Sequence, residues 1–194
     1  MTIVKTIIRN GTRQDAMSLA ELINIAGEGL PVYLWQKMAE PGESVWDVGC
    51  RRALREEGGF SYLNAVCTVS GKTIAASMIG YPLAKVPEPI EPEETPDMFV
   101  PLLELENSAP DTWYVNVLAT YPAYRNQGLG TELLNYAQQQ AKDTQKRGLS
   151  LIVADANQSA RRLYQSFGFS EVASKPMVKE NWSNDSENWI LMVK

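Results

Sequence analysis

The stretch that decides the fold of this chain is Arg125-Asn126-Gln127-Gly128-Leu129-Gly130. It follows an apolar run over residues 113–119 and opens a helix-like segment that continues to about residue 146. A strand, a glycine-bearing turn and a helix in this order present bare backbone N–H groups to an anionic phosphate. The dinucleotide fingerprint Gly-x-Gly-x-x-Gly and the Walker lysine pattern are both absent. The stretch therefore predicts a site for a phosphorylated cofactor, and the remaining sequence must indicate which one.

The composition is typical of one globular domain spanning residues 1–194. Basic residues number 18 against 23 acidic ones, so the net charge of −5 gives no case for a nucleic-acid partner. Nothing approaches the run of about 18 apolar residues that a membrane helix needs. The N-terminus reaches Arg9 before the apolar core of a signal peptide can form. We therefore expect a cytoplasmic protein that binds neither nucleic acid nor a membrane.

The chain contains no histidine. This removes Ser-His-Asp and Cys-His catalysis and the commonest transition-metal ligand, so we expect no metal site. Any catalytic acid or base must be a carboxylate, a tyrosine, a lysine, a thiol or water. Cys50 and Cys67 are too few for a disulfide framework, and we interpret them as reduced thiols rather than a bridge.

Hydrophobic periodicity and turn residues predict the order β, α, α, β, β, then β-α-β-α, then β, β. Thr12 and Asp15 resemble a capping box, and Ser70-Gly71-Lys72 is a hairpin signal. The predicted strands lie at 3–8, 62–69, 73–81, 112–119, 149–154, about 171–179 and 189–193. The predicted helices lie at 12–26, 31–55 with a break near Pro41-Gly42, 128–147 and 159–166. This order predicts a single-domain α/β fold, with a mixed central sheet of about six to seven strands and helices on both faces.

A proline-rich acidic insertion at about 82–111 separates the two halves of this pattern. Residues 82–110 hold seven of the eleven prolines together with several acids. One interpretation is an exposed, stiff connector. The other is a lid over an acceptor site, because long loops inside compact domains are often functional. Residues 98–105 have the composition of a short helix within the insertion.

Two sequence blocks resemble motifs of one superfamily. Residues 118–130, LATYPAYRNQGLG, closely resemble motif A of the GCN5-related N-acetyltransferase (GNAT) superfamily. Residues 157–169, NQSARRLYQSFGF, resemble its motif B, Asn-x-x-Ala-x-x-Leu-Tyr-x-x-x-Gly-Phe. The blocks stand in the family's order, and residues 7–15 also resemble the family's N-terminus. The resemblance implies a GNAT-like fold and identifies the expected cofactor as acetyl-CoA, used as a co-substrate.

The resemblance assigns the pyrophosphate and the pantetheine arm of the cofactor to different parts of the chain. The pyrophosphate is expected on the backbone amides of Gln127 through Thr131, because Gly128 and Gly130 have no Cβ in the way. Arg125 adds a charge-assisted contact. The pantetheine arm is expected along a strand that a bulge splays from residues 151–154. The cofactor-binding residues implied are Leu118, Ala119, Thr120, Arg125, Asn126, Gln127, Gly128, Leu129, Gly130, Thr131 and Asn157.

Two residues of the second block have a structural alternative. The resemblance makes Tyr164 the general acid that protonates the departing thiolate. The alternative is an amphipathic tyrosine whose ring is packed and whose hydroxyl is hydrogen-bonded. Asn157 is expected to bond the pantetheine arm, and a helix N-cap or Asx turn is compatible with that role.

The proton acceptor and the acceptor pocket are less well marked. Residues 113–119 carry no carboxylate, although several family members place a base there. Glu28 is the first candidate, and Glu104, Glu106 and Asp111 are weaker ones; each is also explained as a solvated surface acid. The pocket candidates, which core aromatics would equally resemble, are Tyr33, Trp35, Trp46 and Tyr114.

The predicted function is an acetyl-CoA-dependent N-acetyltransferase. A primary amine of a small molecule or a peptide attacks the thioester directly in a ternary complex. The alternative is a non-catalytic sensor module that binds acyl-CoA without turnover. The acidic insertion favours a cationic acceptor, and a monomer and a homodimer fit the sequence equally well.

Overall fold

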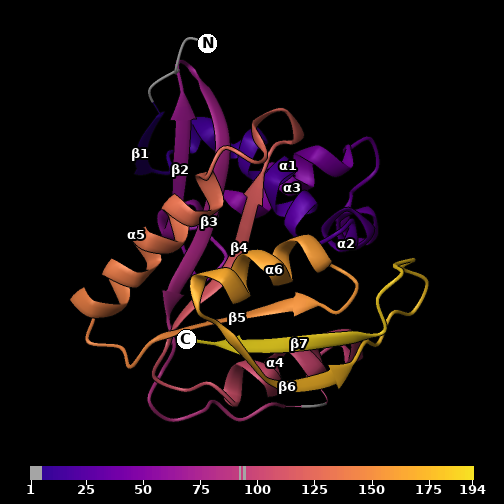
Figure 1. Cartoon of the computed structure of the whole chain (residues 1–194). Helices are drawn as coiled ribbons and strands as arrows, with labels where there is room; N and C mark the ends of the chain where they lie inside the picture. Colours follow the sequence, from indigo (N-terminus) through magenta and orange to yellow (C-terminus); the bar gives the residue numbers. More distant parts are fainter. Residues whose placement is uncertain (1–5, 92, 94) are drawn as a thin grey trace. The chain divides into compact units, whose positions relative to one another are not determined.

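The computed structural model describes residues 6–91, 93 and 95–194 and shows an α/β protein with a seven-stranded mixed sheet (Figure 1). Neighbouring strands are hydrogen-bonded in the order β1-β2-β3-β4-β5-β7-β6. The strands are β1 (Thr6–Asn10), β2 (Ala65–Ser70), β3 (Thr73–Pro82), β4 (Trp113–Thr120), β5 (Leu149–Ala154), β6 (Ser170–Pro176) and β7 (Asn188–Val193). The α-helices of the described residues are α1 (Ala16–Ala26), α2 (Leu30–Met38), α3 (Val45–Ala53), α4 (Val100–Asn107), α5 (Leu129–Asp143) and α6 (Gln158–Phe167). The predicted fold class is confirmed.

The chain divides into two compact units. The N-terminal unit comprises the described residues up to Gly80 together with Asn116–Leu133. The C-terminal unit comprises Tyr81–Val115 and Leu134–Lys194. Strand β4 and helix α5 contribute residues to both units. The prediction of one domain over residues 1–194 stays a prediction.

The first helix begins at the predicted capping box. A short 3-10 turn, Arg13–Asp15, leads into α1. The Asp15 carboxylate accepts hydrogen bonds from the Arg9 guanidinium at 2.7 and 2.8 Å and from the Thr12 backbone N–H at 2.7 Å. These bonds, that from Arg9 above all, lower the pKa of Asp15 to about 2 against the opposing effect of its burial. Gly27 then caps the end of α1, as its position in the sequence predicts.

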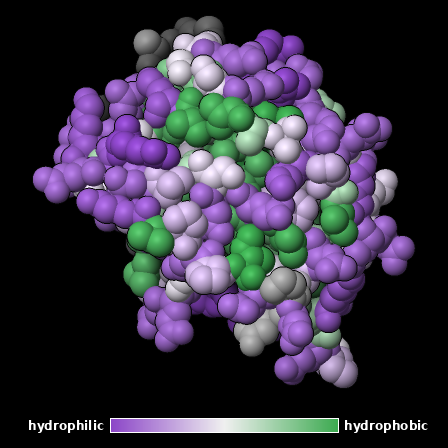
Figure 2. Space-filling model, turned by 90° about the horizontal axis from the view of Figure 1, so that it is seen from below, coloured by the Kyte–Doolittle hydropathy of each residue, from purple (hydrophilic) through white to green (hydrophobic). Residues whose placement is uncertain are grey.

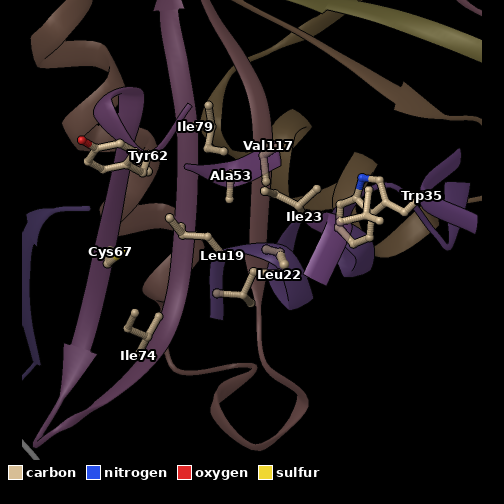
Figure 3. Close-up of a cluster of buried hydrophobic side chains, with 14 of the residues drawn as sticks. Leu19, Leu22, Ile23, Trp35, Ala53, Tyr62, Cys67, Ile74, Ile79 and Val117 are labelled. Carbon is tan, nitrogen blue, oxygen red and sulfur yellow. The ribbon is translucent and has the colours of Figure 1, made fainter. Parts of the chain in front are cut away.

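The core of the N-terminal unit is built on one face of α1 (Figure 3). Leu19, Leu22 and Ile23 recur at helical spacing and are fully buried. They belong to one cluster with Ile79 of β3 and Val117 of β4. Burying each such side chain contributes about 1.5–3 kcal/mol, so this face fixes α1 on the strands.

The insertion contains a packed helix of the C-terminal unit. A 3-10 turn, Asp97–Phe99, leads into α4, which packs against β5, β6 and β7. Leu105 is fully buried there with Leu191 of β7. Helix α6 lies in front of these strands in Figure 1 and α4 behind them. The short helix predicted at residues 98–105 is confirmed, two residues displaced at each end.

The two ends of the insertion are joined at its base. The Asp111 N–H donates to the Ala84 carbonyl at 2.9 Å, and the Leu83 N–H donates to the Thr112 carbonyl at 2.8 Å. The Lys146 ammonium donates to the Leu83 carbonyl at 2.8 Å and to the Asp111 carboxylate at 3.1 Å. The insertion is therefore tied at its base and through α4, and its role as a lid stays a prediction.

Several predicted boundaries were wrong for local reasons. The strand predicted from residue 62 begins at Ala65, because the Ser61 hydroxyl accepts from Leu63 N–H and starts a 3-10 turn. Helix α5 ends at Asp143 rather than at 147, since Gln145 has a φ of 55°. The strand predicted at 171–179 ends at Pro176. Of the strand predicted at 3–8, residues 3–5 lie outside the described residues.

Three further features concern membrane spans, surface hydropathy and the cysteines. Among the described residues no helix is both long and apolar enough to cross a bilayer. Figure 2 shows a largely hydrophilic face with hydrophobic residues in several patches. Cys50 and Cys67 are both free thiols, as expected.

Candidate active site

The turn after β4 contains two residues with left-handed backbone angles. A 3-10 turn, Pro122–Tyr124, follows β4. Asn126 then has a φ of 59° and Gly128 a φ of 84°, both in the left-handed region. A Cβ added at Gly128 would meet no heavy atom within 4 Å. The backbone angle therefore favours glycine here, and glycine leaves open space above the turn.

The N-terminus of α5 offers unsatisfied donors beside this space. The Glu132 N–H donates to the Gly128 carbonyl at 3.0 Å, which is the first bond of the α5 ladder. The N–H groups of Leu129, Gly130 and Thr131 precede that ladder and have no acceptor within the helix. Together with the helix dipole they favour an anion, although Glu132 places an opposing charge in the first turn.

The polar side chains of the turn are exposed and only loosely held. Arg125, Asn126 and Gln127 all face solvent. The Arg125 Nε donates to the Thr120 carbonyl at 3.4 Å, and the Gln127 amide donates to the Ala123 carbonyl at 3.4 Å. Such long bonds are weak, so the Arg125 guanidinium can turn toward an anion at little cost.

The end of β4 alternates between the core and the opposite side. Ala119 is buried in the N-terminal core, whereas Leu118 and Thr120 are half-buried. Next to them the Tyr121 N–H donates to the Ala75 carbonyl at 3.0 Å, and the Tyr121 hydroxyl bonds the Glu21 carboxylate. Tyr121 thus anchors the turn to β3 and α1, a role that its sequence context gave no means of predicting.

The candidate acceptor residues of the N-terminal unit lie in the α1–α2 turn, on α2 and, for Trp46, on α3. Glu28, with a φ of 52°, stands in the turn between α1 and α2. The Tyr33 ring lies on α2 beneath the Lys37 ammonium, 4.3 Å from the ring centroid. Trp35 is 3% exposed and packs edge-on against Trp46 at 6.2 Å. The two tryptophans thus pack against each other as core aromatics would. The pocket roles of Tyr33, Trp35 and Trp46, and the role of Glu28 as a base, stay predictions.

Asn157 caps helix α6, as one of its two predicted roles requires. Its Oδ1 accepts from the Ala160 N–H at 3.1 Å. The preceding Asp155 carboxylate accepts from the Asn188 and Glu187 backbone N–H groups, each at 3.0 Å. These bonds fix the start of α6 to the segment before β7. The contact between Asn157 and a pantetheine arm stays a prediction.

Tyr164 is a buried phenol without a hydrogen-bond partner among the described residues. Its side chain is 7% exposed, and its ring packs against Phe169 at 5.8 Å. Burial raises the pKa of the Tyr164 hydroxyl well above its ordinary value, so the group is neutral and keeps its proton. The alternative role of Tyr164 is a packed ring with a hydrogen-bonded hydroxyl. The packed ring is observed, and a hydrogen bond of the hydroxyl to a described residue is not.

A second buried phenol, Tyr114, lies against a carboxyl group. Tyr114 is 4% exposed, and its hydroxyl hydrogen-bonds to Glu106 of α4. The Tyr81 ring meets the Tyr114 ring edge-on at 5.7 Å. Burial, and next the charge of Glu88, raise the pKa of Glu106 to about 7, although the Tyr114 hydroxyl opposes the shift. A half-buried carboxyl that titrates near neutrality is typical of a catalytic acid or base.

The other two acids named in the insertion are paired with lysines. Glu104 bonds Lys175 of β6 at 2.9 Å, and Asp111 bonds Lys146 at 3.1 Å. Neither carboxylate lies against a neutral hydroxyl group as Glu106 does. Within residues 6–91, 93 and 95–194, no group of three or more cysteine, aspartate or glutamate side chains is arranged to hold a metal ion.

Comparison with known families agrees with these features. The sequence profile of the Acetyltransferase (GNAT) family matches residues 34–169, which is most of the chain. This protein therefore belongs to the GNAT acetyltransferase family. No curated protein matches the chain by sequence.

Solved structures share the fold over nearly the whole chain. One acetyltransferase is 20% identical with a TM-score of 0.66, over 97% of this chain and 98% of that one. An N-acetyltransferase from Staphylococcus aureus Mu50 is 19% identical with a TM-score of 0.64, over 97% and 100%. The ribosomal-protein-S18-alanine N-acetyltransferase from Escherichia coli is 17% identical with a TM-score of 0.54, over 97% and 92%. At these identities the likeness shows the fold alone.

The predicted site residues are divided between the two units. The turn, the end of β4, and the residues Glu28, Tyr33 and Trp35 belong to the N-terminal unit. Asn157, Tyr164 and Tyr114 belong to the C-terminal unit. Their assignment to one cofactor and one acceptor therefore rests on the family and is taken up as a proposal.

Proposed function

We propose that this protein is an acetyl-CoA-dependent N-acetyltransferase that transfers an acetyl group to a primary amine of a small molecule or peptide. The observation that carries the proposal is the turn at Gly128. It combines a left-handed glycine, open space above it and three donor N–H groups at a helix N-terminus. Those features fit the pyrophosphate of coenzyme A, and membership in the family supports this choice of anion.

Tyr164 supplies the proton for the leaving group in this proposal. The sulfur leaves as a thiolate, which is a better proton acceptor in apolar surroundings than in water. Burial keeps the Tyr164 phenol neutral, and no described side chain competes for its proton. The phenol therefore still carries its proton when a thiolate forms beside it.

The reaction proposed needs no covalent enzyme intermediate. The amine attacks the thioester carbonyl directly, and backbone N–H groups of the splayed strand β4 stabilise the developing oxyanion. Holding donor and acceptor together supplies the proximity that this bimolecular step requires. The partner proposed is a small-molecule or peptide amine, the enzyme is proposed to work in the cytoplasm, and no metal takes part.

Calorimetry and thiol release test the proposal together. Acetyl-CoA should bind, and coenzyme A thiol should appear when a panel of polyamines, aminoglycosides and peptides is added. Absence of acetyl-CoA binding would refute both the enzyme and a sensor of the same fold. Binding without thiol release across the panel would favour the acyl-CoA sensor. Acetylated product identified by mass spectrometry shows which nitrogen receives the group.

A further inference from the structure

Three carboxylates of the insertion differ in their partners. Glu104 and Asp111 are each paired with a lysine ammonium, which competes with any substrate cation. Glu106 instead faces the neutral Tyr114 hydroxyl. The insertion thus contains one described carboxyl that combines burial with a neutral, hydrogen-bonding neighbour.

The elements around Glu106 hold it in one place. Its helix is fixed by Leu105, the preceding residue, which is fully buried. The loop that carries Glu88 is tied to the same helix, because the Asn107 amide donates to the Glu88 carbonyl at 2.8 Å. Tyr114 is fixed in turn by Tyr81 from the neighbouring strand β3. Glu106 is therefore an oriented carboxyl rather than a solvated surface acid.

We propose that the Glu106 carboxylate accepts the proton of the acceptor amine and that Tyr114 is the residue that positions it. This inference rests on the proposed acetyl transfer. It replaces Glu28 as the proposed proton acceptor, and it locates the acceptor's amine at the side of the C-terminal unit where α4 meets β4.

The proton and electron balance is simple. The amine nitrogen forms a bond to the thioester carbonyl carbon, and the carbon–sulfur bond breaks with its electron pair on sulfur. The surplus N–H proton passes to a Glu106 oxygen, and the sulfur takes the Tyr164 proton. Solvent then carries one proton from Glu106 to the Tyr164 phenolate, which restores both groups and leaves an amide and a thiol.

The charges around Glu106 determine the expected pH dependence. Glu88 faces it from the loop and Tyr114 from β4. On the elements packed against α4, Lys175 is paired with Glu104 and Glu171 with Arg161, while Asp97 lies on the preceding 3-10 turn. Because the carboxylate is the active form, the profile of kcat/KM against pH should contain a rise with its midpoint at about 7, where the Glu106 pKa lies. Deprotonation of the acceptor amine adds a separate rise at higher pH.

The decisive variant is Glu106→Gln, with Glu91→Gln as the control. Glu91 is an exposed acid of the same insertion, so its variant makes the same chemical change away from the Glu106–Tyr114 pair. Glu106→Gln keeps the shape and a hydrogen-bonding group, and it should lower kcat/KM by about 10²–10⁴-fold and remove the rise whose midpoint lies at about 7, while the rise due to the amine remains. Glu91→Gln should match the unmodified enzyme. Acetyl-CoA affinity by calorimetry should be the same in all three proteins.

Tyr114→Phe separates positioning from mere packing. The variant keeps the ring and removes the hydroxyl. In the unmodified protein that hydroxyl lowers the Glu106 pKa, so its loss should raise it. The midpoint of the pH profile should therefore move upward, which loss of packing alone would not produce. An unmoved midpoint would overturn the role of Tyr114.

The outcomes distinguish this inference from the proposed function. If the unmodified protein acetylates an amine and Glu106→Gln does so at the same rate, the role of Glu106 is overturned and the proposed acetyl transfer stands. A large loss in Glu104→Gln or Glu28→Gln, with Glu106→Gln active, would do the same and identify another base. An intact enzyme without acetyl-CoA binding would instead refute the proposed function itself.

Discussion

Replacing Gly128 with alanine tests the proposed anion-binding role of the turn. Gly128 has a φ of 84°, and a Cβ there would meet nothing within 4 Å. The variant should therefore fold without a clash, at the cost of holding alanine in the left-handed region. That cost is about 1–2 kcal/mol. For a chain of this size each kcal/mol lowers Tm by about 2–4 °C.

Gly42→Ala supplies a matched control in the same unit. Gly42 has a φ of 88°, and its Cβ would likewise meet nothing within 4 Å. The two variants should therefore lose similar thermal stability. Only Gly128→Ala puts a methyl group into the space where the pyrophosphate is proposed to lie.

The two variants should differ in acetyl-CoA affinity. A hydrogen bond to a charged group contributes about 1.5–3 kcal/mol, so losing one raises Kd about ten- to a hundredfold. Calorimetry on both variants, with Tm measured by circular dichroism, gives the comparison. Equal acetyl-CoA affinities of Gly128→Ala and Gly42→Ala would refute the pyrophosphate site at this turn.

Three further predictions concern single residues. Tyr164→Phe should lower kcat about 10²-fold or more in the thiol-release assay while calorimetry shows unchanged acetyl-CoA affinity; an unchanged kcat would remove its role as acid. Leu105→Ala should cost about 2–5 kcal/mol in urea unfolding, because the side chain is fully buried; a cost below 1 kcal/mol would contradict the packing of α4. Asp15→Asn should cost about 2 kcal/mol at pH 7, because the native pKa of Asp15 is held at about 2. That contribution is present above about pH 4 and is lost as pH falls through about 2, so the Asp15 variant and the parent should converge in acid.

Local patterns predicted the elements that a continuous apolar run or a turn signal marks in the sequence. Strand β5 occupies residues 149–154 as predicted, and the Ser70-Gly71-Lys72 hairpin joins β2 to β3. The turn at Gly128 followed from the same kind of signal, since a left-handed backbone restricts which residue can stand there. The boundaries that failed are those where one side chain redirects the backbone, as Ser61 does before β2.

The carboxyl at Glu106 shows where sequence reasoning stops. In the sequence it is one of several acids in a proline-rich segment, and its neighbours give it no distinguishing pattern. Its properties come from Tyr114, Glu88 and the burial of α4, all of which depend on tertiary packing. Glu104, two residues earlier, instead pairs with Lys175 of β6. A helix places neighbouring side chains in different directions, so only the fold decides which of these acids is buried.

The family's sequence pattern therefore describes the donor more fully than the acceptor. In the proposed reaction the turn at Gly128 binds the same pyrophosphate whatever amine is acetylated, so its backbone conformation should be tightly constrained. A proton acceptor has only to be oriented and to titrate near the working pH, and any carboxyl that the fold buries beside a neutral donor meets that need. In this chain an inserted helix carries Glu106 to Tyr114, whereas the strand that leads into the turn carries no acid at residues 113–119. A proton acceptor carried on an insertion can change with the acceptor amine, while the turn proposed to bind the acetyl donor keeps its conformation.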